Sequence, residues 1–128
     1  MIIRNRYQRI TIIRSEKPNE RNVNNDLQWF GTSLGLFNLR DKDKSCFRVF
    51  IELIRAAKKQ EPISSDEIAA RLKLSRATVI HHINKLTDSG FVAVEKNRYI
   101  LRVSNLRNLV DELSEDAERT LKDLREIA

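Results

Sequence analysis

The stretch from residue 64 to residue 86, SSDEIAARLKLSRATVIHHINKL, decides how this chain folds. Ser64 followed three residues later by Glu67 matches a capping box, so a helix is expected to begin there. Ser75 can cap a second helix over roughly 76–89, because its hydroxyl can accept a hydrogen bond from a free backbone N–H group. The stretch therefore predicts two short helices joined by a tight turn.

The second predicted helix has two chemically different sides when its residues are placed about 100° apart. Val79, Ile83 and Leu86 cluster on one side and are expected to face a core. The opposite side carries Ala77, Thr78, His81, Asn84, Lys85 and Asp88, with Arg76 beside the N-terminal end. Small side chains and hydrogen-bond donors on an exposed helix are what readout of the DNA major groove requires. Phosphate would repel Asp88, which is expected outside the contact.

Gly90 is expected to end the second helix with a left-handed residue. The two apolar runs that follow it predict a β-hairpin. Its core-facing residues are expected to be Val92, Val94, Tyr99 and Leu101 or their neighbours, and its tip Lys96, Asn97 and Arg98. The two cations suit the DNA backbone or minor groove, whereas Asn97 is ordinary turn chemistry. A helix pair followed by a basic hairpin is the layout of a winged helix-turn-helix. The predicted fold is mainly α with a small β-hairpin wing, an added N-terminal segment and a long C-terminal helix.

Two helices are expected in the residues before this stretch. Residues 44–59 predict the first helix of the domain, because a wide apolar stripe runs along them, and Cys46 on that stripe is expected to be a buried small hydrophobe. Residues 24–38 predict a short amphipathic helix capped by Asn25 or Asp26, with a connection to residue 43. Gly31 and Gly35 weaken that helix and allow another helix to approach closely.

Residues 1–23 predict a basic N-terminal arm, or a short strand near Arg9–Arg14, followed by a polar linker. Two alternatives stay open for this segment. It can reach along DNA, or it can be a solvated terminus or edge strand, and the second is favoured because basic termini are often mobile. The domain organisation is therefore 1–23, 24–43, a DNA-binding domain over 44–103, and a final helix over 104–128.

The final helix has the most regular apolar pattern in the chain. Its stripe consists of Leu106, Val110, Leu113, Ala117, Thr120, Leu124 and Ile127, widened by Leu109 and Leu121. A helix of about 36 Å, at 1.5 Å per residue, is too long to be buried fully on so small a domain. A homodimer is therefore favoured over a helix that folds back on its own chain. The predicted interface is Leu106, Leu109, Val110, Leu113, Ala117, Leu121 and Leu124.

Composition favours an acidic partner and excludes several classes of protein. The 128 residues carry a net charge of +6, yet residues 104–128 hold seven acidic against four basic side chains. The predicted reading head is thus basic and the final helix acidic. No apolar segment approaches the ~20 residues of a membrane span, so no membrane association is expected. A single cysteine permits no internal disulfide and fits a reducing cytoplasm, the expected location.

Catalysis is not expected. His81 and His82 are the only histidines, and adjacent helical positions point about 100° apart, so they cannot chelate one metal together. The sequence contains no Gly-rich phosphate loop, paired-cysteine motif or nucleophile elbow. No catalytic residue, metal site or cofactor is therefore predicted, and the sequence specifies no small-molecule effector.

The run LKLSRATVIHHINKL at 72–86, with Gly90-Phe91-Val92 and Asn97-Arg98-Tyr99, resembles the arsenic-repressor-type (ArsR-like) winged-helix regulators. The resemblance implies a dimeric repressor whose two recognition helices occupy successive major grooves. Its implied groove contacts are Ser75, Arg76, Ala77, Thr78, His81 and Lys85, and its implied wing contacts are Lys96 and Arg98.

The sequence departs from the family pattern at two places. Many members have Gly where this chain has Lys73, so the turn must accept a left-handed non-glycine residue. Metal-sensing members have cysteines near Ser64 and Ser65, and their alternative site needs a histidine on the last helix, which has none here. Metal sensing by either route is therefore not expected.

The function predicted from the sequence is a sequence-specific regulator that binds double-stranded DNA. The residues predicted to contact DNA are Ser75, Arg76, Ala77, Thr78, His81, Asn84, Lys85, Lys96, Asn97 and Arg98. The alternative is a winged-helix adaptor that binds protein within a transcription or other assembly. Such an adaptor would normally have a less basic or more apolar face than this one.

Overall fold

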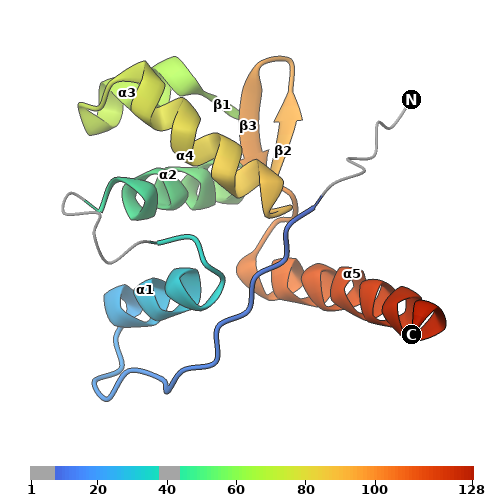
Figure 1. The fold of residues 1–128 in the computed structure, drawn as a ribbon. Coiled ribbons are helices and arrows are strands. Elements are labelled where there is room, and N and C mark those ends of the chain that lie inside the picture. The colour runs from blue at the N-terminus through green and yellow to red at the C-terminus, as the bar shows by residue number, and fades with distance from the viewer. Residues whose placement is uncertain (1–7, 38–43) are drawn as a thin grey trace.

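The computed structural model describes residues 8–37 and 44–128 and, within them, a helical domain with a small antiparallel sheet (Figure 1). The elements in chain order are α1 (Val23–Ser33), α2 (Ser45–Lys59), β1 (Ile63–Ser64), α3 (Ser65–Leu72), α4 (Arg76–Asp88), β2 (Val92–Glu95), β3 (Arg98–Leu101) and α5 (Leu106–Ile127). The predicted fold class, a winged helix-turn-helix with an N-terminal segment and a long final helix, is confirmed.

Local capping explains where α3 and α4 begin. The hydroxyl of Ser64 accepts a hydrogen bond of 3.1 Å from the backbone N–H of Glu67, and Ser75 does the same for Thr78 at 3.1 Å. Between the helices Lys73 has a φ of 55°, so the turn does contain a left-handed non-glycine residue. Gly90, with a φ of 83°, follows α4 as predicted.

The sheet has the order β1-β3-β2, with β3 at its centre. β1 was not predicted, because it has only two residues, one of them the cap of α3, and so short a segment carries no strand pattern. It pairs Ser64 with Arg98 and Ile63 with Tyr99, whereas β2 pairs Val92 with Leu101 on the other side of β3. The start of α3 is thereby joined to the wing.

The core lies where α2, α3 and α4 meet the base of the sheet and the start of α5. Its fully buried side chains include Phe50, Leu53, Ile68, Val79, Ile83, Leu86, Phe91 and Leu109. Cys46 is buried, as predicted from its place on the apolar stripe. Val94 was expected in the core but is 57% exposed, because the outer end of the wing extends beyond the helices that cover its base (Figure 1).

α1 is shorter than predicted. Asn22, rather than Asn25 or Asp26, caps it by accepting a hydrogen bond from the backbone of Asn25. Asp26 instead accepts a hydrogen bond from Arg21, which lowers the pKa of that carboxyl group against a smaller opposing effect of burial. The helix ends at Ser33 rather than near residue 38, because Gly35 turns the backbone with a φ of 73°.

Gly31 and Gly35 were expected to allow the close approach of another helix, but their nearest neighbours come from segments that are not helical. At Gly31 a Cβ atom would lie 1.8 Å from the ring of Phe37, which comes from the segment following α1. At Gly35 a Cβ atom would lie 2.8 Å from the side chain of Thr11. Both close approaches are thus made by non-helical segments.

Residues 8–14 form an irregular segment, here called the N-terminal strap, and the strand considered near Arg9–Arg14 is absent. The backbone N–H of Arg9 donates to the carbonyl of Asp88 at 3.0 Å, and that of Ile13 to Ser33 at 2.7 Å. The strap therefore runs from the end of α4 to the end of α1 (Figure 1). The rest of the predicted ranges 1–23 and 24–43 includes residues 1–7 and 38–43, which lie outside the described residues.

α5 has two unlike halves. Leu109 and Leu113 in its first half are buried in the core, whereas all residues from Glu118 onward are exposed. The second half extends away from the domain (Figure 1). Within residues 8–37 and 44–128, no helix is long and apolar enough to cross a membrane.

Candidate nucleic-acid interface

The outward side of α4 is the centre of the candidate interface. Ala77, His81 and Asn84 are exposed, whereas Val79, Ile83 and Leu86 are buried on the opposite side. The polar side predicted for this helix is therefore exposed, and the apolar side is buried. Asp88 is exposed on the outward side, at the C-terminal end.

The first turn of α4 has a fixed arrangement of side chains. The hydroxyl of Ser75 donates to Oγ1 of Thr78 at 2.8 Å while it accepts from the Thr78 backbone. Thr78 is half-buried and Ser75 exposed. Because the two hydroxyls hold each other, their orientation toward solvent is set before any ligand arrives.

The cations of this surface differ in how firmly they are held. Nε of Arg76 lies 3.4 Å from Oδ1 of Asp66, in an ion pair in which both side chains are more than two-thirds exposed. Lys85 is half-buried beside the outward side of α4. Exposed ion pairs of this kind are weak, so Arg76 can exchange its carboxylate partner for another anion.

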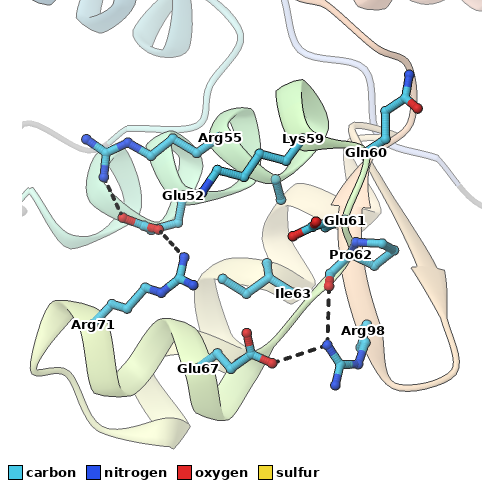
Figure 2. A pocket seen from close by; sticks show the side chains of 11 residues that line it. Glu52, Arg55, Lys59, Gln60, Glu61, Pro62, Ile63, Glu67, Arg71 and Arg98 are labelled. Carbon is cyan, nitrogen blue, oxygen red and sulfur yellow. Dashed lines mark hydrogen bonds and ion pairs between the residues drawn. The ribbon is translucent and has the colours of Figure 1, made fainter.

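The tip of the wing is a turn of two residues. Lys96 and Asn97 have φ values of 49° and 65°, the left-handed geometry of a tight hairpin turn, and both are exposed. Arg98 was predicted to be part of this tip but is the first residue of β3. Its guanidinium donates to Oε1 of Glu67 at 3.2 Å and to the carbonyl of Pro62 at 3.5 Å, toward α3 (Figure 2).

The N-terminal strap borders the same surface. A cleft of about 510 Å³ lies between the strap and the C-terminal half of α4. The residues that line it are Arg9, Thr11, Gly35, His81, Asn84, Lys85, Asp88 and Ser89. Arg9 and Thr11 were not among the predicted site residues. The basic character of residues 1–23 was their only signal in the sequence.

The two histidines of α4 have separate environments. His81 is exposed on the outward side, and its ring lies edge-on to that of His82 with centroids 5.4 Å apart. Nε2 of His82 lies 2.7 Å from the hydroxyl of Ser45, which ties α4 to the start of α2. In the described part of the chain, no three His, Cys, Asp or Glu side chains form a group that could hold a metal ion.

A second cleft, of about 720 Å³, lies between α2, α3 and the base of the wing (Figure 2). Its most buried acid is Glu52 of α2, which pairs with Arg55 at 2.9 Å and with Arg71 of α3 at 3.4 Å. Although Glu52 is charged, its side chain is only 5% exposed. The pair with Arg71 links α2 and α3. Arg98, a predicted DNA contact, also lines this cleft together with its partner Glu67.

The predicted dimer residues separate into two groups. Leu109 and Leu113 are buried in the core of their own chain, and Leu106 packs against that core. Val110, Leu121 and Leu124 are between 43% and 59% exposed, and Ala117 is half-buried. An apolar groove of about 370 Å³ runs between the strap and α5. Val110, Ala117 and Leu121 line it from α5, Ile10 and Ile12 from the strap, and Phe91 also lines it.

Comparison with known proteins agrees with this geometry. Residues 43–95 match a family model described as a helix-turn-helix domain. The match covers α2, β1, α3, α4 and β2, and it makes DNA the supported partner of this region. Domains of this kind are typically non-enzymatic. No curated protein matches the chain.

Proposed function

We propose that this chain is a transcriptional regulator that binds specific sequences of double-stranded DNA, with α4 in the major groove and the wing on the backbone or minor groove. The observation that carries the proposal is the outward side of α4, where Ala77, His81 and Asn84 are exposed beside Arg76. An N-terminal turn of small and donor-bearing side chains fits readout of base edges. Lys96 and Asn97, exposed at the wing tip, suit contacts that position the protein on the duplex.

The proposal includes a homodimer formed through α5. Val110, Ala117, Leu121 and Leu124 lie within about 60° of arc on this helix, at about 100° per residue. The exposed members of this stripe and the adjoining apolar groove can be covered by a second copy. Two recognition helices would then read half-sites about one helical turn apart. The resemblance to arsenic-repressor-type regulators favours a repressor.

The N-terminal strap is proposed as a lateral extension of the DNA-binding surface. Its backbone bond to Asp88 holds Arg9 beside Asn84 and Lys85 in the cleft along α4. An exposed guanidinium at this place suits a phosphate that flanks the groove. This favours the first of the two alternatives for the basic N-terminus, contact along DNA.

The direct test is binding to random and to selected duplexes at two salt concentrations. A DNA-binding protein should lose affinity steeply with salt, by about −0.9 in the log–log slope for each phosphate neutralised. Reversal of charge with Arg76→Glu and Lys85→Glu should abolish binding while the fold and oligomeric mass stay unchanged. Lys17→Glu with Lys122→Glu, two exposed cations outside the strap, α4 and the wing, is the matched control. Full affinity of the first double variant would refute the assignment of α4 as the reading helix.

The protein-binding adaptor is kept as a second candidate because of one observation. Arg76 and Arg98 both have carboxylate partners within the chain, so the surface is less cationic than its sequence implies. An adaptor would show little affinity for random duplex at low salt and little change as salt rises. The same titration therefore separates the two functions.

A further inference from the structure

Asp66 and Glu67 are consecutive acids in the first turn of α3, and each faces a different arginine. Oδ1 of Asp66 lies 3.4 Å from Nε of Arg76, the first residue of α4. Oε1 of Glu67 lies 3.2 Å from Nη1 of Arg98, the first residue of β3 (Figure 2). The two arginines predicted to contact DNA from the recognition helix and from the wing are thus paired with neighbouring acids.

The backbone explains why both arginines meet one helix end. Ser64, the cap of α3, pairs with Arg98 across β1 and β3, which places the wing strand beside the start of α3. Arg76 follows the left-handed turn at Lys73, and its side chain reaches back to Asp66 in the first turn of α3. A duplex that contacts both Arg76 and Arg98 must therefore pass close to Asp66 and Glu67.

We propose that Asp66 and Glu67 are specificity-determining residues that act as internal counter-charges for Arg76 and Arg98. This inference rests on the proposed function and adds a mechanism of discrimination to it. A phosphate that approaches either arginine must displace a carboxylate and then lie near that negative charge. Binding to arbitrary sequence depends almost entirely on phosphate contacts, so the acids weaken it most. Binding to a preferred sequence also has base contacts, so its relative loss is smaller.

The exposure of these groups fits exchange of partners rather than a permanent structural bond. All four side chains are between 42% and 75% exposed. Ion pairs at such exposure are weak and are screened by salt, so DNA phosphates can displace them. In a complete capping box the carboxylate of Glu67 would accept a hydrogen bond from the backbone N–H of Ser64. Here that carboxylate pairs with Arg98 instead.

A purely structural role makes a different prediction. Acids in the first turn of a helix stabilise it through the helix dipole, and loss of that effect would lower thermal stability without raising affinity for DNA. If the two acids act as counter-charges, their neutralisation should raise the affinity for DNA. Affinity for random duplex, measured together with the melting temperature, therefore distinguishes the two roles.

The experiment compares Asp66→Asn, Glu67→Gln and the double variant with wild type on two duplexes. One duplex has random sequence, and the other is selected from a random pool by the wild-type protein. Each single variant should bind random duplex about threefold more tightly and the double variant about tenfold, with a smaller gain on the selected duplex. The salt slope of the double variant on random duplex should be steeper by about one to two.

The matched control is Glu16→Gln with Glu20→Gln, which removes the same charge from exposed positions in the loop before α1, away from α3 and the wing (Figure 1). An equal gain in the control, or none in the double variant, would overturn the inference while DNA binding by the wild type still supports the proposed function. Absence of duplex binding by every form at low salt would overturn the proposed function itself. In an Arg76→Gln background, the gain from Asp66→Asn should fall by more than half if the acid acts through that arginine.

Discussion

The guanidinium of Arg102 donates a hydrogen bond of 2.8 Å to the carboxylate of Asp116, and this bond joins the exit of the wing to α5. Asp116 is buried. It also accepts a hydrogen bond of 3.3 Å from Gln8 of the strap and forms an ion pair with Arg119. One carboxylate therefore connects the wing, the final helix and the N-terminal strap. Together with the burial of Leu109 and Leu113, it holds α5 against the domain.

Replacement of Asp116 should lower stability in a way that depends on pH. Burial alone would raise the pKa of Asp116, but hydrogen bonds from Arg102 and Gln8 outweigh it and hold the pKa below its ordinary value. Asp116→Asn should reduce the free energy of unfolding at pH 7 by about 1–3 kcal/mol. A depressed folded pKa contributes stability above the unfolded value of about 3.9, and this is lost as pH falls through the folded value.

Urea denaturation of wild type and variant at pH 7 and at pH 3 checks this prediction. The difference between the two proteins should shrink at the lower pH, where the wild-type carboxylate becomes protonated. Asp111→Asn, at an exposed position on the same helix, is the control and should change stability little at either pH. An equal difference at both pH values would mean that the charge of Asp116 is not what stabilises the cluster.

Gly31→Ala should destabilise the domain although alanine is the better helix former. The added Cβ atom would overlap the ring of Phe37, which packs edge-on to Phe47 and Phe50 at centroid distances of 5.3 and 6.0 Å. Overpacking of this kind costs about 1–3 kcal/mol, against a gain of about 1 kcal/mol in helix propensity. Thermal denaturation should show a lower melting temperature, and the loss should be smaller in a Phe37→Leu background. A stabilised single variant would contradict the packing.

Substitution of the exposed apolar stripe should yield a monomer that keeps its fold. Leu121→Ser with Leu124→Ser removes side chains that are 46% and 59% exposed, so circular dichroism should change little. Sedimentation velocity should show half the wild-type mass, whereas Lys122→Ala with Asp123→Ala should leave the mass unchanged. Truncation before Ser104 is a poorer test, because it also removes Leu109 and Leu113 from the core. A wild-type monomer, or an unchanged mass of the serine variant, would reject the dimer.

Arg9→Ala should weaken DNA binding by a similar factor for every sequence. A residue that contacts only phosphate contributes no base readout, and its loss should make the salt slope shallower by about one. Binding isotherms on selected and random duplexes measure this, with Lys17→Ala, at an exposed cation outside the strap, as the control. A loss confined to the selected duplex would instead assign Arg9 to base recognition.

Signals that are local in sequence predicted much of this fold. Ser64, Ser75 and Gly90 mark helix ends through hydrogen bonds and backbone angles that involve only near neighbours, and the structure places all three as predicted. The apolar periodicity of α2 and the buried side of α4 follow from helical geometry alone. These features set the outward side of α4, on which the candidate site depends.

Relationships between distant residues were not predictable from the same signals. The partner of Arg98 is Glu67, 31 residues away, and the strap joins Gln8 to Asp116 across 108 residues. No periodicity encodes such pairs, because they arise only when the elements have packed. Val94 illustrates a related limit: strand alternation gives the correct face, but the place where the covering helices end decides whether that face is buried.

The burial of Cys46 gives this protein a built-in probe of its own motions. It is the only sulfhydryl in the chain, and 2% of its surface is exposed. An alkylating reagent can therefore reach it only when α2 transiently separates from its surroundings, so the labelling rate reports the free energy of that opening. If operator binding clamps the domain, the same reaction should slow on addition of DNA, without any engineered dye or tag.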